Sequence, residues 1–148
     1  MRALRPSLSG VSSPGSKATL GRRMRILVAE DDPAVAKLYA AYAQSRGHGV
    51  LFARDGAETL VRAASELPDL ILLDVSMPEL DGRDALRELK ASDRTSRIPV
   101  LVISAFGGDQ HLRDLLLELG AFDVMEKPVD LQIAFTKAER VVSALKPA

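Results

Sequence analysis

The chain has 148 residues and a mass of 15.9 kDa, the size of one ordinary domain. With 47% hydrophobic and 27% charged residues, it is composed like a globular protein. The absence of cysteine excludes disulfides and thiolate chemistry, and two histidines are too few for a multi-histidine zinc site. No apolar run approaches the roughly 20 residues that cross a bilayer, so we expect a cytoplasmic protein with no membrane partner.

Charge is unevenly distributed along the chain. Residues 1–23 carry five basic and no acidic residues, whereas the other 125 carry 15 basic and 20 acidic residues, a net charge of −5. Because these 125 residues are acidic overall, we expect no direct binding to nucleic acid. The first 23 residues are rich in Ser, Gly and Pro without periodicity, which predicts a disordered tail or extension. Because Met24 begins the first strand pattern, we expect it to be the native start, and residues 146–148 to be a short tail.

From Met24 onward, short apolar runs alternate with stretches of helical periodicity. The runs predict strands at 25–29, 50–53, 70–73, 100–103 and 122–125. Three of them are continuously apolar, which is typical of parallel strands covered on both faces. Five such units predict one α/β domain over residues 24–145, a doubly wound parallel sheet with helices on both faces.

The stretches between these runs predict five helices with marked ends. Asp32 and Pro33 begin the first, with the apolar stripe Val35, Leu38 and Tyr42. Asp55 and Glu58 have capping-box spacing, followed by Leu60, Ala64 and Leu67. The third helix holds Leu86 and Leu89, and the fourth runs from Asp109 to Gly120 through Leu112, Leu115, Leu116 and Leu119. The fifth covers about residues 129–145, with the stripe Leu131, Phe135, Ala138, Val142 and Leu145.

A few side chains fall outside these stripes. Leu117 and Ile133 are off the core faces of the fourth and fifth helices, which indicates a surface for another protein there. We expect His48 and His111 to face solvent and to take no part in chemistry.

Chemically distinctive residues follow four of the predicted strands. These are Glu30–Asp31–Asp32, Asp74, Ser104 and Lys127–Pro128. In an open parallel sheet, ligands bind outside the carboxyl ends of the strands, so these side chains would form one acidic cup. Carboxylates without His or Cys favour Mg²⁺ as the cation. A cation, a lysine and a hydroxyl together suit the positioning of a phosphoryl group.

At these positions the sequence resembles the receiver domain of bacterial two-component response regulators. The resemblance is carried by the strings at 26–33 (ILVAEDDP) and 74–82 (DVSMPELDG), by Ser104–Ala105 and by Lys127–Pro128, and it covers residues 24 to about 145. It implies a flavodoxin-like fold with strand order 2-1-3-4-5.

The resemblance also implies roles for single residues. Asp74 would accept a phosphoryl group from a sensor histidine kinase or a histidine phosphotransfer protein. Ser104 would hydrogen-bond a phosphoryl oxygen, and Lys127, before a cis peptide bond to Pro128, would pair with Asp74 and then with the phosphate.

For the metal, the resemblance implies that Asp31 and Asp74 bind Mg²⁺ directly. Glu30 would act mostly through water, and the backbone carbonyl of Ser76 would complete the protein ligands.

One position departs from the family pattern. Receivers usually carry Tyr or Phe three residues before the lysine, and this ring takes part in the switch, but Val124 stands here. Phe122, two residues earlier, would point to the same side of a strand and partly replace the ring. Gly107–Gly108 would provide a loose hinge after the fourth strand.

We therefore expect a stand-alone response regulator that signals by protein contact at the face of the fourth helix, fifth strand and fifth helix. Two alternatives stay open: a phosphorelay shuttle, which Val124 favours, and a receiver fragment of a longer regulator. A Mg²⁺-dependent phosphatase would need a second acid two residues after its nucleophile, where Ser76 stands. We expect no enzyme activity beyond self-phosphorylation from small donors and slow self-dephosphorylation.

Overall fold

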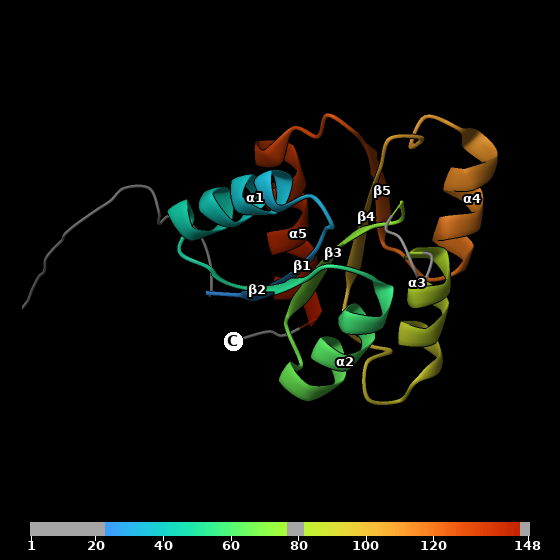
Figure 1. Cartoon of the computed structure of the whole chain (residues 1–148), viewed down its shortest axis with the longest axis horizontal. Helices are drawn as coiled ribbons and strands as arrows, with labels where there is room; N and C mark the ends of the chain where they lie inside the picture. Colours follow the sequence, from blue (N-terminus) through green and yellow to red (C-terminus); the bar gives the residue numbers. More distant parts are fainter. Residues whose placement is uncertain (1–22, 77–81, 146–148) are drawn as a thin grey trace, which may run out of the picture.

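The computed structural model describes residues 23–76 and 82–145, which form five parallel strands alternating with five helices (Figure 1). The strand order is β2-β1-β3-β4-β5, so the expected fold class and topology are confirmed. The strands are β1 (Arg25–Ala29), β2 (Gly49–Ala53), β3 (Leu70–Asp74), β4 (Val100–Ser104) and β5 (Asp123–Glu126). The expected tails, residues 1–23 and 146–148, lie outside the described residues except for Arg23.

The helices cover both faces of the sheet (Figure 1). They are α1 (Pro33–Ser45), α2 (Gly56–Glu66), α3 (Gly82–Ala91), α4 (Gln110–Glu118) and α5 (Leu131–Leu145). One core lies between the sheet and α1 and α5, and the other lies between the sheet and α2, α3 and α4. Every residue of β3 and β4 is buried, as their continuous apolar runs predicted.

The predicted helix ends are mostly confirmed. The Asp32 carboxylate caps α1, and the Asp109 carboxylate caps α4 by accepting two backbone N–H groups. Gly120 ends α4 at φ +117°, a left-handed conformation that favours glycine. Asp55 caps α2, but the Glu58 carboxylate accepts the N–H of Arg54 and so reaches one residue further back than a capping box does.

The predicted apolar stripe of α1 is wrong at Leu38, which is 59% exposed. The residues that α1 buries are instead Ala36, Tyr39, Ala40 and Ala43. Leu67, the C-cap of α2, is also exposed, whereas Thr59 and Ala63 of this helix are fully buried. Small side chains let these helices lie close to the sheet, so the largest apolar residues do not mark the buried face.

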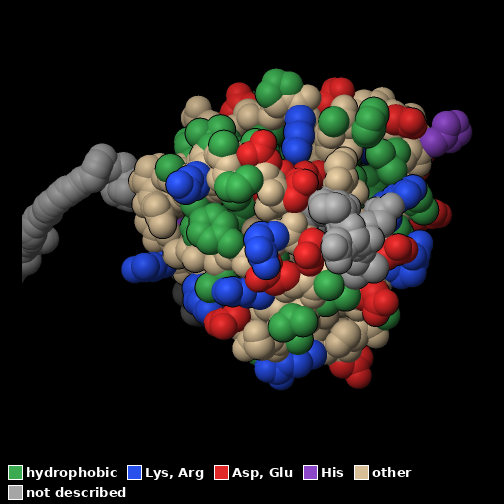
Figure 2. Space-filling view, viewed as in Figure 1, with side chains coloured by type: hydrophobic (Ala, Val, Ile, Leu, Met, Phe, Trp, Pro, Cys, Tyr) green, Lys and Arg blue, Asp and Glu red, His purple; other side chains and the backbone are tan. Residues whose placement is uncertain are grey.

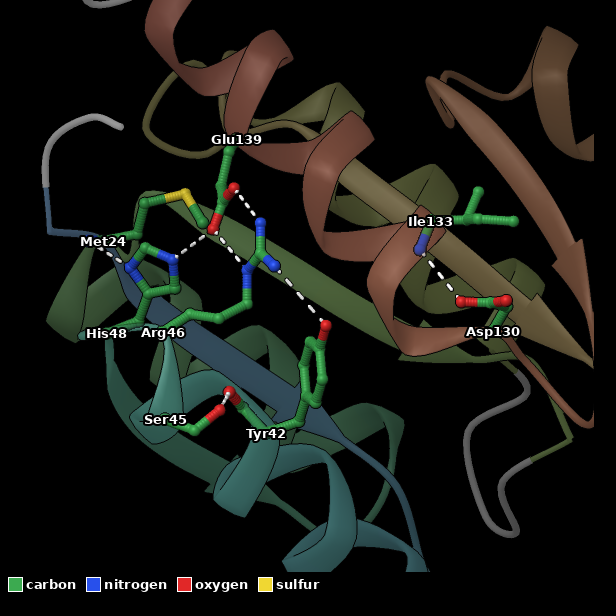
Figure 3. Close-up of polar contacts among 8 residues, drawn as sticks. All are labelled: Met24, Tyr42, Ser45, Arg46, His48, Asp130, Ile133 and Glu139. Carbon is green, nitrogen blue, oxygen red and sulfur yellow. Dashed lines mark hydrogen bonds and ion pairs between the residues drawn. The ribbon is translucent and has the colours of Figure 1, made fainter. Parts of the chain in front are cut away.

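His48 is buried, so its expected exposure is wrong (Figure 3). Its Nδ1 accepts the N–H of Met24 at 3.0 Å, so Nε2 carries the hydrogen and donates to Glu139 Oε2 at 2.8 Å. The Arg46 guanidinium pairs with both oxygens of Glu139, at 2.9 and 2.6 Å. This cluster ties the start of β1, the turn before β2 and the end of α1 to α5. His111 is exposed, as expected.

The surface in Figure 2 mixes acidic and basic side chains with scattered hydrophobic ones. Among the described residues, no helix combines the length and the apolar character that crossing a membrane requires.

Candidate functional site

The candidate site lies where the chain changes direction in the sheet. β1 and β3 are neighbours in the middle of the sheet, and the register pairs Ala29 with Leu73. The residues that come next on the two strands, Glu30 and Asp74, therefore lie side by side. From β1 the chain crosses to β2 on one side, and from β3 it crosses to β4 on the other, which is the switch point where doubly wound folds bind ligands.

Three carboxylates meet at this point. Glu30, Asp31 and Asp74 each offer one oxygen, and these oxygens lie within 4.8 Å of one another. Glu30 and Asp74 are both 4% exposed, whereas Asp31 faces solvent. A set of oxygen ligands with one open side fits Mg²⁺, which prefers a few carboxylates and retains water. The three carboxylates that the resemblance assigned to the metal are thus brought together.

Asp74 is held through both of its carboxylate oxygens. Oδ1 accepts the backbone N–H of Ser76 at 2.9 Å, and Oδ2 lies 3.1 Å from Nζ of Lys127. Asp74 is the last residue of β3, so its backbone is fixed by the sheet. Residues 77–81 of the string lie outside the described residues, and Gly82 begins α3.

Lys127 brings the end of β5 to the acidic group. Its Nζ also lies 3.3 Å from Glu30 Oε1, and the Lys127–Pro128 bond is cis, as the resemblance implied. The Lys127 N–H donates to the carbonyl of Ser104 at 2.9 Å, which fixes the backbone from which the side chain extends. Burial acts to lower the pKa of Lys127, but its bonds to Asp74 and the charge of Glu30 outweigh burial and raise it.

The carboxyl of Glu30 has a strongly raised pKa. Burial, and next the charge of Asp74, raise the pKa of Glu30 from 4.5 to about 7. The N–H of Asp32 and the charge of Lys127 oppose this rise. Two buried carboxylates are costly to ionise together without more positive charge than one lysine supplies. The site therefore favours additional positive charge.

Ser104 ends β4, the strand next to β3, and the register pairs Ile103 with Asp74. Ser104 is fully buried, and its Oγ accepts the N–H of Phe106 at 3.0 Å. The hydroxyl is thus tied to the loop that leads to α4.

Val124 is 2% exposed and belongs to the core on the α2, α3 and α4 side. Phe122 packs against the opposite core, so its expected replacement of the missing ring is wrong. β5 begins only at Asp123, and the alternation of a strand does not extend back to Phe122. A Cβ on Gly107 would lie 2.8 Å from the Cα of Glu126, so this glycine permits a close backbone approach instead of a loose hinge.

Sequence reasoning missed a group of charged side chains beside Val124. Asp123 is 8% exposed and contacts Arg113 of α4 and Lys137 of α5. Burial raises the pKa of Asp123, but the bonds from Lys137 and the Val124 N–H outweigh it and lower the pKa. The three charged residues come from three elements, so no local motif marks them.

Tyr39 was also missed as a neighbour of the site. It is buried in α1, and burial raises the pKa of its phenol, while the positive charge of Lys127 acts in the opposite direction.

Residues 26–139 match the model of the response regulator receiver domain family. Among similar proteins, response regulator PleD of Caulobacter vibrioides is 42% identical over 113 residues, which are 76% of this chain and 25% of PleD. Response regulator MprA of Mycobacterium avium is 36% identical over 124 residues, 84% of this chain and 53% of MprA. The chain thus spans about half the length of these relatives, or less.

Solved receiver domains have the same fold. The receiver domain of the Francisella response regulator 1452 superposes with a TM-score of 0.78 at 26% identity, covering 84% of this chain and all of that one. The receiver domain of the sensor histidine kinase PA1611 from Pseudomonas aeruginosa has a TM-score of 0.74 at 29% identity, covering 82% and 99%. That structure contains a magnesium ion coordinated in the active site cleft.

Proposed function

Because the chain belongs to the response regulator receiver domain family of two-component systems, we propose that it accepts a phosphoryl group on Asp74 with Mg²⁺. One observation carries this proposal: Lys127 lies 3.1 Å from a carboxylate oxygen of Asp74 inside a group of three acids. The donor would be a phosphohistidine of a sensor histidine kinase or a histidine phosphotransfer protein.

In the transfer, a carboxylate oxygen of Asp74 forms a bond to phosphorus as the bond from phosphorus to the donor imidazole nitrogen breaks. The electron pair of the broken bond stays on the imidazole nitrogen, which then takes a proton from water. The attacking group would be the carboxylate, so this step would need no base. Such reactions depend mainly on positioning and on charge stabilisation.

Mg²⁺ would be held by Asp31 and Asp74, with Glu30 through water and the Ser76 carbonyl as the remaining protein ligand. When bound, the cation neutralises charge on the transferring phosphoryl oxygens. Lys127 already contacts Asp74 and supplies a second positive charge to the phosphorylated state. The Ser104 hydroxyl would donate to a phosphoryl oxygen once it leaves the N–H of Phe106.

We propose that the output is protein contact at the face of α4, β5 and α5, where Leu117 and Ile133 are 37% and 54% exposed. The only catalysis proposed is self-phosphorylation from small donors and slow self-dephosphorylation, in the cytoplasm. Because the chain spans only part of its relatives, its stand-alone role is part of the proposal. A phosphorelay shuttle is the second candidate, since Val124 provides no ring for the usual switch.

Intact-mass spectrometry after incubation with acetyl phosphate and Mg²⁺ tests this function. We expect a gain of about 80 Da, one phosphoryl group. The gain should vanish in Asp74→Asn and in excess chelator, and persist in Asp93→Asn, a control at an exposed aspartate before β4. Equal gain in Asp74→Asn would place the acceptor elsewhere, and no gain from acetyl phosphate or from a phosphorylated kinase would refute the function.

A further inference from the structure

Among the strands of residues 23–76 and 82–145, β5 is an edge strand that pairs with β4 alone, yet both backbone polar groups of Val124 are covered by side chains. The Val124 N–H donates to Asp123 Oδ1 at 2.8 Å, and the Val124 carbonyl accepts from Nη1 of Arg113. The edge is thus closed at the very position where an aromatic ring is missing.

Arg113 reaches this edge from α4, which is weakly attached by apolar contacts. Leu116 is the only buried residue of this helix, while Leu112 packs partly against the core. Nη2 of Arg113 also lies 2.9 Å from Asp123 Oδ1, and these side chains are 36% and 12% exposed. Two acceptors on β5, the Val124 carbonyl and Asp123 Oδ1, thus fix the Arg113 guanidinium. Arg113 therefore provides a polar attachment of α4 to β5.

The same carboxylate also contacts α5. Lys137 of α5 donates to Oδ2 of Asp123, while Arg113 of α4 donates to Oδ1. A change in the position of Arg113 therefore alters the charge balance around a residue that also holds α5.

A chain of hydrogen bonds connects this helix to the candidate site. The Phe106 N–H donates to Ser104 Oγ at 3.0 Å, and the Asp109 N–H donates to the carbonyl of Phe106 at 3.0 Å. Asp109 is the N-cap of α4. If the Ser104 hydroxyl turned to a phosphoryl group, it would release the Phe106 N–H at the start of this chain.

We propose that Arg113 is the positioning residue through which phosphorylation of Asp74 controls α4. Before phosphorylation, the guanidinium holds α4 against the Val124 carbonyl and Asp123. Afterwards, the loop from Ser104 shifts α4, both bonds of Arg113 open, and the population moves to a state with a mobile α4. The inference rests on the proposed phosphoryl acceptance, and it assigns to an arginine a contact between α4 and β5 that Val124 cannot supply.

Hydrogen exchange of the full chain, read by mass spectrometry with and without acetyl phosphate and Mg²⁺, tests this role. In the wild type, we expect phosphorylation to speed exchange in residues 110–118 by at least about fivefold. In Arg113→Gln, exchange there should be faster by a similar factor before phosphorylation and rise less than about twofold after it. Arg113→Lys, which retains one donor group, should lie between, and Arg140→Gln on α5 serves as the matched control.

Two further readouts make the result decisive. The proposal would be overturned if α4 of Arg113→Gln exchanged at the wild-type rate both before and after phosphorylation. It would also be overturned if exchange rose equally in residues 56–66 of α2, since an equal rise indicates global unfolding. Intact mass in the same samples separates the two proposals. Without mass gain in the wild type, both fail, whereas mass gain with unchanged exchange refutes only the role of Arg113.

Discussion

Glu139→Gln should destabilise the domain measurably, because this carboxylate is the centre of the cluster in Figure 3. The Glu139 side chain is 14% exposed and accepts two hydrogen bonds from Arg46 and one from His48. Gln keeps the size of the side chain but removes its charge. Its NH₂ group replaces one carboxylate oxygen and so faces an N–H donor of Arg46 or His48 that it cannot accept from. The variant therefore loses one bond and weakens the others.

The expected loss in free energy of unfolding is about 2–3 kcal/mol. A hydrogen bond to a charged group contributes about 1.5–3 kcal/mol, and Arg46 keeps 25% exposure, so water relieves part of the unpaired charge. Urea denaturation at pH 7 measures the loss. Glu118→Gln, at an exposed position of α4, is the matched control and should stay within about 0.5 kcal/mol of the wild type.

The pH dependence gives a second measurement of the same interaction. Burial acts to raise the pKa of Glu139, but its bonds with Arg46 and His48 outweigh burial and lower it. A carboxyl whose pKa is lower in the folded state stabilises fully above its unfolded pKa, about 4.3, and loses this as the pH falls through the folded pKa. The difference in free energy of unfolding between wild type and Glu139→Gln should therefore shrink as the pH falls below the pKa of the unfolded carboxyl. A difference under about 0.5 kcal/mol at pH 7, or one that is unchanged down to pH 3, would refute the reasoning.

Three further substitutions test other parts of the structure. Val124→Tyr should change the rate of phosphoryl uptake, measured by intact mass, by less than about tenfold, or 1.4 kcal/mol of barrier. The reason is that Val124 faces a core and not the acids. A larger fall would mean that residue 124 takes part in phosphoryl transfer. Ser104→Ala removes the acceptor of the Phe106 N–H and should cost about 1–3 kcal/mol in urea denaturation, whereas wild-type stability would contradict this bond. Asp55→Ala should cost about 1 kcal/mol through loss of the α2 cap, and an unchanged urea midpoint would argue against that cap.

The fold could be predicted from the sequence because its strongest signals are local. Continuous apolar runs mark β3 and β4, and single residues such as Asp32 and Gly120 mark helix ends. The buried face of α1 was misassigned at Leu38, since alanines pack against the sheet there. A search for periodic large apolar side chains does not detect contacts that alanines make.

The acidic part of the site was also accessible from sequence, since its residues directly follow two of the predicted strands. The burial of His48 was not, because its contact Glu139 lies 91 residues further along the chain. The contacts among Arg113, Asp123 and Lys137 depend likewise on three elements meeting in space. Such contacts leave no pattern within any one segment.

The covered edge at Val124 also bears on whether β5 can pair with the edge strand of another molecule. An open strand edge offers unpaired N–H and carbonyl groups to the edge of another molecule. A second chain could add a strand at this position only after displacing Arg113 and Asp123. The side chains that attach α4 to the sheet therefore also oppose strand pairing between two copies at Val124.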